Sequence, residues 1–295
     1  MLVVFVISGN STELIYGNIL RLPSHMYAAI VSKSYQKMII IKMENGYPVV
    51  ADQFIAVTGL KFGDKRYKGD MRTPSGVYFP VSFKPERILP SYFGKGAYPL
   101  NYPNALDKYI IHRDGDGIWI HGSNEKKLLF FSSKGCVILN NKDFSELEKY
   151  VVLKKTPVII QERFVKLKID EFNRLKEKID NFIDQWEKAL LQLYARNTTA
   201  IENFYSDNFK SEKGSKHDLI NSYKSDFVVY GDNKPLITDF NRMIFYDKRN
   251  NGMEYFVVSL NLAYLSGDEI KSLKKILYLT VENKKLKIIT EETIK

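Results

Sequence analysis

A stretch without any glycine or proline, from Val158 to Lys213, divides this sequence into two parts of different character. Inside it, apolar residues recur every three or four positions, which is the period of one face of an α-helix. These positions are Val165, Ile169, Phe172, Leu175, Ile179, Phe182, Trp186, Leu190 and Leu193. We therefore expect one long amphipathic helix and a domain boundary close to Glu162. A chain of 295 residues can form two domains that each bury their own core.

The part before the helix is predicted to be mostly β-structure. Apolar runs predict strands over residues 27–31, 37–43, 109–111, 118–120 and 157–160. Asn45-Gly46 predicts a hairpin turn, because this pair tolerates positive φ. The segment 63–78, with three glycines and a proline, and the segment 98–104, with two prolines, predict loops, which often carry function when a rigid sheet supports them. A short helix is expected from Asp143 to about Val151, with Asp143 as its cap.

The part after the boundary combines helices with a later sheet. A second, shorter helix is expected around residues 203–209, followed by strands at 227–230, 243–246, 255–264, 275–281 and 286–290. The predicted fold class is therefore α+β, with a mostly-β domain over 25–161 and an α+β domain of a long helix and a curved antiparallel sheet over 162–295. Residues 1–24 are left as an N-terminal segment. Its apolar start, Met1 to Ile7, resembles a shortened export signal without a preceding Lys or Arg, and a first strand or a dimerisation segment is the alternative.

Composition excludes several function classes. The net charge of +10 favours polyanionic partners, but the lysines are spread along the chain and no helix-turn-helix, zinc-finger or RNA-binding signature is present, so nucleic acid is not expected. No apolar run reaches the length of a transmembrane helix. His25, His112 and His217 are isolated, and there is no phosphate-binding glycine loop, so neither a metal nor a cofactor is expected.

Cys136 is the only cysteine and cannot form an intramolecular disulfide. It follows Gly135, which lets the backbone approach a reacting carbonyl closely, and Lys134 supplies a nearby cation that favours the thiolate. His121 ends a predicted strand upstream, where its direction would be fixed. The pattern indicates a Cys–His nucleophile pair, and spacing alone leaves open that both residues are core packing.

Thiol attack on an amide carbonyl needs a base, a group that holds the base, and donors for the oxyanion. His121 suits the first role and the backbone carbonyl of Gly122 suits the second. The backbone N–H groups of Gly135 and Cys136 are the candidate oxyanion donors.

Four motifs in this order resemble the YkuD-like L,D-transpeptidase catalytic domain, a bacterial peptidoglycan-processing fold. They read GDKRYKGDMRTPSGVY, YPLNYPN, GDGIWIHG and SSKGCVILNNKDF. The resemblance covers residues 27–161 and implies that Cys136 is the nucleophile and His121 the base, with Gly122 as the carbonyl-donating third member.

One difference from the family motif indicates a particular branch of the family. The family motif has Ser-His-Gly-Cys followed by an arginine, whereas here Lys134 replaces the histidine and residues 137–140 contain no arginine. This variant, with a second domain that resembles a nuclear-transport-factor-two-like fold, is similar to the cell-shape L,D-carboxypeptidase branch of Gram-negative bacteria. The resemblance implies a periplasmic enzyme that trims peptidoglycan stem tetrapeptides to tripeptides by removing the terminal D-Ala.

A carboxypeptidase must bind a free carboxylate, so we expect Lys134 to bind it, with Arg113 or Arg72 as the alternatives. Ser133, Trp119 and Tyr102 complete the residues expected at the substrate site, although Trp119 also suits a core position. Asp64 and Asp70 either face substrate or pin their loop by ion pairs. The alternatives are an L,D-transpeptidase that forms cross-links and a non-catalytic wall-binding scaffold, and a homodimer through the second domain stays open.

Overall fold

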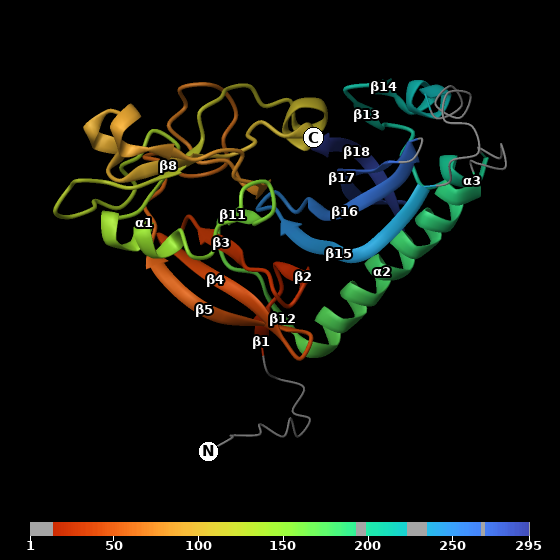
Figure 1. Cartoon of the computed structure of the whole chain (residues 1–295), viewed down its shortest axis with the longest axis horizontal. Helices are drawn as coiled ribbons and strands as arrows, with labels where there is room; N and C mark the ends of the chain where they lie inside the picture. The colour runs from red at the N-terminus through yellow and green to blue at the C-terminus, as the bar shows by residue number, and fades with distance from the viewer. Residues whose placement is uncertain (1–13, 193–198, 223–234, 267–268, 295) are drawn as a thin grey trace, which may run out of the picture.

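The computed structural model describes residues 14–192, 199–222, 235–266 and 269–294, which form two domains (Figure 1). The predicted α+β class is confirmed: the first domain is mostly β with a short helix, α1 (Asn141–Leu147), and the second combines a long helix with a curved antiparallel sheet. Within these ranges, no helix has the length and apolar character needed to cross a membrane.

Two sheets build the first domain. One has the order β5-β4-β3-β11-β6, in which β3 and β11 are parallel. The other has the order β10-β9-β8-β7, in which β9 and β10 are parallel. The strands are β3 (Ala28–Ser32), β4 (Lys37–Glu44), β5 (Tyr47–Ile55), β6 (Gly76–Tyr78), β7 (Lys84–Pro85), β8 (Gly96–Pro99), β9 (Trp119–His121), β10 (Val137–Ile138) and β11 (Val158–Gln161). The predicted turn between β4 and β5 is confirmed by positive φ at Asn45 and Gly46.

A buried apolar core supports the strands of this domain that later carry the site. Val31 and Ile40 of the larger sheet belong to the same core as Ile120 and Val137 of the smaller sheet, together with Phe144 of α1. This core removes apolar surface from water and fixes β9 and β10 on the domain.

The second domain packs a helix on a five-stranded sheet with the order β18-β17-β16-β15-β2. Apolar side chains of α2, among them Phe172, Ile179 and Trp186, are buried against it. The elements are β12 (Lys166–Lys168), α2 (Ile169–Gln192), α3 (Thr199–Glu202), β13 (Lys210–Ser211), β14 (Gly214–Ser215), β15 (Pro235–Lys248), β16 (Glu254–Ser266), β17 (Glu269–Glu282) and β18 (Lys285–Ile294).

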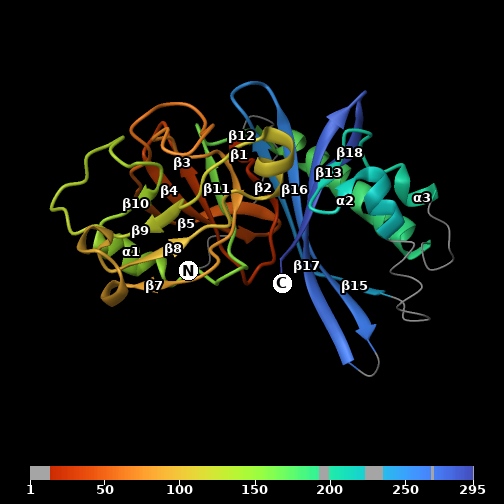
Figure 2. The ribbon, with the colours of Figure 1, turned by 90° about the horizontal axis from the view of Figure 1, so that it is seen from above.

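The opposite face of this sheet packs on the first domain. Figure 2 shows the sheet between the first domain and the helices α2 and α3. Ile30 and Phe79 of the first domain share one buried cluster with Phe245, Val257 and Tyr278 of the second. Because this interface is apolar and continuous, the two domains form one packed unit.

The described part of the N-terminal segment joins the second domain. β1 (Leu14–Tyr16) pairs with β12, and β2 (Ile19–Arg21) forms the edge strand beside β15. The apolar start of the chain, Met1 to Ile7, lies outside the described residues.

Three local predictions were wrong in detail. Residues 109–111 are the end of a helical turn (Leu106–Ile111) rather than a strand, because Asn104 and Asp107 cap that turn by exchanging hydrogen bonds. The cap of α1 is Asn140, whose side chain accepts from the backbone N–H of Asp143 at 2.8 Å. The long helix begins at Ile169, because the residues before it pair with β1.

The shorter helix is also displaced, since α3 ends at Glu202 and β13 begins at Lys210. The predicted strand at 227–230 and the last predicted helix position, Leu193, lie outside the described residues. The remaining predicted strands of the second domain fall within β15 to β18.

Candidate active site

The register of β9 and β10 brings Cys136 and His121 to one face of the sheet. The strands are parallel, with Val137 opposite Ile120 and Ile138 opposite His121. Ile120 and Val137 point into the core. Because side chains alternate along a strand, Cys136 and His121 both lie on the opposite face. Cys136 precedes Val137 and is therefore level with Trp119, two residues before His121 on the neighbouring strand.

The thiol of Cys136 lies among backbone groups of the preceding loop. Its Sγ is 3.4 Å from the carbonyl oxygen of Gly117, to which the S–H donates. Burial raises the pKa of Cys136, and a hydrogen bond from the backbone of Trp119 and the charge of Lys65 oppose the rise without cancelling it. Cys136 is therefore a thiol, not a thiolate, at neutral pH.

His121 is held by its own neighbour. It is 5% exposed, and its Nδ1 lies 2.7 Å from the carbonyl oxygen of Gly122. Because a carbonyl only accepts, Nδ1 carries the proton and Nε2 is the basic atom. Phe93 packs its ring edge-to-face on the imidazole at 4.8 Å. Burial lowers the pKa of His121 despite the Gly122 hydrogen bond, so the ring is neutral and able to accept a proton.

Gly122 and Gly135 are required by close packing. A Cβ on Gly122 would lie 2.5 Å from the side-chain oxygen of Asn141, and one on Gly135 would lie 3.0 Å from the carbonyl oxygen of Arg72. Gly135 also has a φ of +131°, which favours glycine. The turn that presents Cys136 is therefore pressed against the loop that carries Arg72.

Ser133 closes that turn. Its hydroxyl donates to the carbonyl oxygen of Cys136 at 2.6 Å and accepts from the N–H of Gly135 at 3.0 Å. The Gly135 N–H is already engaged, which corrects its prediction as an oxyanion donor. For the Cys136 N–H we find no acceptor among the described residues, so it stays the candidate donor.

Comparison with known proteins agrees with this geometry. Residues 26–160 match the model of the L,D-transpeptidase catalytic domain YkuD, and residues 174–292 match that of the Cds6 C-terminal NTF2-like domain. The chain therefore contains a YkuD-type L,D-transpeptidase catalytic domain followed by an NTF2-like domain. The family resemblance predicted from the four motifs is confirmed.

Relatives share the fold over different lengths. YafK of Escherichia coli strain K12, whose name assigns it to the L,D-transpeptidases, is 24% identical over 167 residues, and the match spans 56% of this chain and 63% of YafK. The chain thus covers less than two thirds of that relative. Bd1075 of Bdellovibrio bacteriovorus superposes with a TM-score of 0.75 at 22% identity, covering 95% of this chain and 98% of that one. The helical cell shape determining protein Pgp2 from Campylobacter jejuni superposes at 0.74 and 24% identity, covering 94% and 95%.

The cation whose charge acts on the thiol of this YkuD domain is not the predicted one. Lys134 is exposed on the turn, whereas the charge that acts on Cys136 is that of Lys65. Lys65 is buried and paired with Asp70 at 2.8 Å. Sequence reasoning missed Lys65. Its closeness to Asp70 within the first motif, GDKRYKGD, was the available signal.

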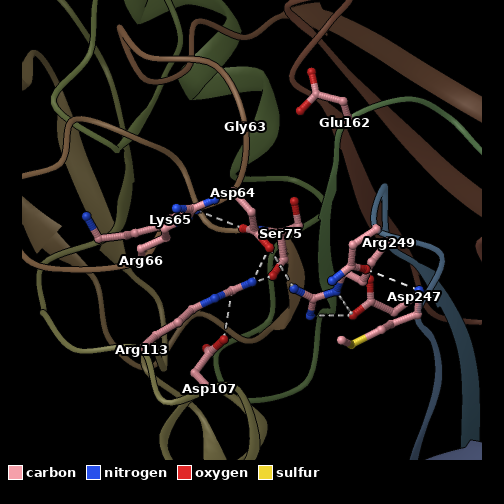
Figure 3. Close-up of polar contacts among 12 residues, drawn as sticks. Gly63, Asp64, Lys65, Arg66, Ser75, Asp107, Arg113, Glu162, Asp247 and Arg249 are labelled. Atoms are coloured by element: carbon pink, nitrogen blue, oxygen red, sulfur yellow. Dashed lines mark hydrogen bonds and ion pairs between the residues drawn. The ribbon is translucent and has the colours of Figure 1, made fainter.

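Arg113 and Tyr102 are structural, contrary to the prediction that they contact substrate. The Arg113 side chain is 3% exposed and donates to Asp107 and to the carbonyl oxygen of Ser75, both at 2.9 Å. It also pairs with Asp64 (Figure 3). The Tyr102 hydroxyl is buried and donates to the carbonyl oxygen of Asp114 at 3.1 Å.

Arg72 and Trp119 keep accessible surface beside the site. The Arg72 side chain is 26% exposed, with Nε donating to the carbonyl oxygen of Phe62 at 2.8 Å. Trp119 is half-buried, with its ring 5.0 Å from Phe93 and the ammonium of Lys84 5.6 Å away. Both therefore stay predicted substrate contacts.

Asp64 and Asp70 pin their loop rather than face substrate. Asp70 accepts from Lys65 and from the N–H groups of Arg66 and Arg72 at 2.7 and 3.1 Å. Asp64 accepts from the N–H of Ser75 at 2.7 Å. No group of three or more His, Cys, Asp or Glu within the described ranges could hold a metal ion.

Proposed function

We propose that this protein is a periplasmic cysteine L,D-carboxypeptidase of a Gram-negative bacterium, which removes the terminal D-Ala from peptidoglycan stem tetrapeptides. The observation that carries the proposal is the pair of Cys136 and His121 on one face of β9 and β10, both neutral. A neutral imidazole beside a neutral thiol suits general-base catalysis, because the proton moves only as the nucleophile attacks.

The reaction follows from this arrangement. His121 Nε2 accepts the Cys136 proton while Sγ bonds to the diaminopimelate carbonyl carbon, and the oxyanion forms near the Cys136 N–H. The tetrahedral intermediate collapses, the C–N bond breaks, and the D-Ala amine leaves with the proton from His121. Water then loses a proton to His121 and attacks the thioester, releasing the tripeptide carboxylic acid and restoring the thiol.

The D-Ala carboxylate is assigned to Lys134. Its ammonium is exposed and lies two residues from the nucleophile, and Arg72 borders the same turn. Because both cations are accessible, removing either should raise KM more than it lowers kcat. A further supporting observation is the superposition on the cell shape determinant Pgp2, and we propose that trimming by this enzyme influences cell shape.

The family name and the similarity to YafK favour a second candidate, an L,D-transpeptidase that forms cross-links. In that reaction an amine of a second stem peptide, rather than water, resolves the thioester. The two candidates differ only in the acceptor, so product analysis separates them.

Mass spectrometry of muropeptides incubated with wild type, Cys136→Ala and the exposed-surface control Lys126→Ala tests the proposal. Loss of one alanine from tetrapeptide with wild type and Lys126→Ala, but not Cys136→Ala, is the expected result. Cross-linked dimers would establish the transpeptidase instead. Unchanged muropeptides with all three proteins would contradict both enzymatic functions and favour the non-catalytic wall-binding scaffold.

A further inference from the structure

Asp64 joins the two domains. Its Oδ2 accepts from Arg113 of the catalytic domain and, at 3.1 Å, from Nη1 of Arg249 in the turn between β15 and β16 (Figure 3). Burial would raise the pKa of Asp64, but the charges of Arg113 and Arg249 outweigh it and the pKa lies below its ordinary value. Asp64 is therefore an ionised carboxylate shared by two arginines from different domains.

The side chain of Arg249 is held in one orientation by Asp247. Its Nε and Nη2 both donate to Oδ2 of Asp247, at 2.8 and 2.6 Å, and its side chain is 6% exposed. Its backbone N–H donates to the carbonyl oxygen of Met253 at 2.8 Å. Asp247 is fully buried and also accepts from Gln161 at 3.3 Å. A guanidinium already held by Asp247 through Nε and Nη2 presents Nη1 to Asp64 with little further loss of rotamer entropy.

The other oxygen of Asp64 holds both ends of one loop. Oδ1 accepts from the N–H of Lys65 at 2.9 Å and from the N–H of Ser75 at 2.7 Å. The loop between them, residues 64–75, contains no strand or helix. We call it the Asp64 loop.

The Asp64 loop packs against the nucleophile turn and also supplies a charge that acts on it. The carbonyl oxygen of Arg72 lies 3.0 Å from the position of a Cβ on Gly135. Lys65, at the start of the loop, is the charge that acts on Cys136. A shift of this loop would therefore move both the packing surface behind Gly135 and the cation near the thiol.

We propose that Arg249 of the NTF2-like domain is a positioning residue for Cys136, which acts through Asp64 and the Asp64 loop. The second domain is then part of the catalytic apparatus and not only an appended module. Arg249 touches no reacting atom, and its effect reaches Cys136 only by holding Asp64.

Alkylation of Cys136 by iodoacetamide across a pH series tests the proposal in the full chain. Cys136 is the only cysteine, so the rate reports this thiol alone. Arg249→Ala is expected to raise the apparent pKa of alkylation by about half a unit, which is about threefold less thiolate at neutral pH. Arg249→Lys should restore part of the wild-type profile. Lys248→Ala, next to Arg249 at the end of β15 and paired with the half-buried Glu254, is the matched control and should leave the profile unchanged.

A double-mutant cycle tests whether Arg249 acts on Cys136 through Asp64. Asp64→Asn should shift the profile in the same direction, and Arg249→Ala should add little in the Asp64→Asn background, because the Asp64–Arg249 ion pair is already disrupted there. Thermal unfolding identifies variants that fail to fold. Arg249→Lys, which keeps a cation for Asp247, then provides the comparison. A folded Arg249 variant with the wild-type alkylation profile, or additive shifts in the cycle, would overturn the proposal.

A second test measures the rate of D-Ala release from tetrapeptide, and it rests on the proposed function. Arg249→Ala is expected to lower kcat with little change in KM. Absence of D-Ala release in wild type and every variant would count against the carboxypeptidase. The alkylation profile needs no substrate, so it would still decide whether Arg249 positions Cys136.

Discussion

The ammonium of Lys274, on β17 of the second domain, lies 3.6 Å from the ring centre of Phe79 in the catalytic domain. It also donates to the carbonyl oxygen of Lys154 at 2.6 Å. Burial at this interface lowers the pKa of Lys274 to about 7, and Glu292 only partly offsets the loss of hydration. The domain interface thus contains a cation that gives up its proton near neutral pH.

Lys274 makes stability depend on pH. Its pKa is about 7 in the folded state and 10.5 when unperturbed, so between these values the unfolded chain binds more protons and stability rises with pH. Lys274→Met lacks this contribution. We expect its Tm relative to wild type to be highest below neutral pH and to fall as pH increases toward 10, as measured by calorimetry. A constant difference across this range would contradict the assignment, and Lys154→Met is the exposed control.

The neutral state of Cys136 predicts slow alkylation. Because burial raises the pKa of the thiol, iodoacetamide should react slowly at neutral pH and faster along a single titration whose midpoint lies above the ordinary value of about 8.5. In denaturant the midpoint should return to the ordinary value. Fast alkylation of the folded protein below neutral pH would instead show a preformed thiolate–imidazolium pair.

Gly122→Ala should disable the base. The added methyl would lie 2.5 Å from the Asn141 side-chain oxygen and 3.1 Å from the Lys95 nitrogen, so the backbone that holds His121 must shift. A shift of about 1 Å in a catalytic group costs about a hundredfold in rate. Activity should be partly restored by Asn141→Ala in the same chain, which removes the nearest atom. Wild-type activity in the single variant would show that the Gly122 contact with His121 is dispensable.

Lys65→Met should affect both stability and the nucleophile. Asp70 is fully shielded from water and would lose its ammonium partner, which costs about 3 kcal/mol for a buried pair. The thiol pKa of Cys136 should rise further, because the charge of Lys65 opposes the effect of burial. Chemical denaturation measures the first effect and alkylation the second. Lys65→Arg keeps the charge, and an alkylation profile like that of Lys65→Met would argue against an electrostatic role.

Some residues of the candidate site can be predicted from the residues next to them in the sequence, and others cannot. Cys136, His121 and Gly122 stand in short motifs, and their roles depend on neighbours within a few positions or on one strand pairing. Arg249 depends on its contact with Asp64, and Lys65 on its closeness to Cys136, and both relations join distant parts of the chain that no local pattern encodes. Arg113 illustrates the reverse error, because an arginine near a catalytic motif suggests a substrate contact until its burial is known.

The sequence by itself determined the α+β class and the long helix after Glu162, and it singled out Cys136 and His121 as the candidate nucleophile and base, because helical periodicity, turn residues and short motifs are properties of neighbouring residues. Only the tertiary structure decided that β2 completes the sheet of the second domain, that Lys65 rather than Lys134 acts on Cys136, and that Arg249 reaches Asp64. These contacts join residues far apart in the chain. They form because the two domains share one apolar core, and burial then determines which charges pair and which remain in water.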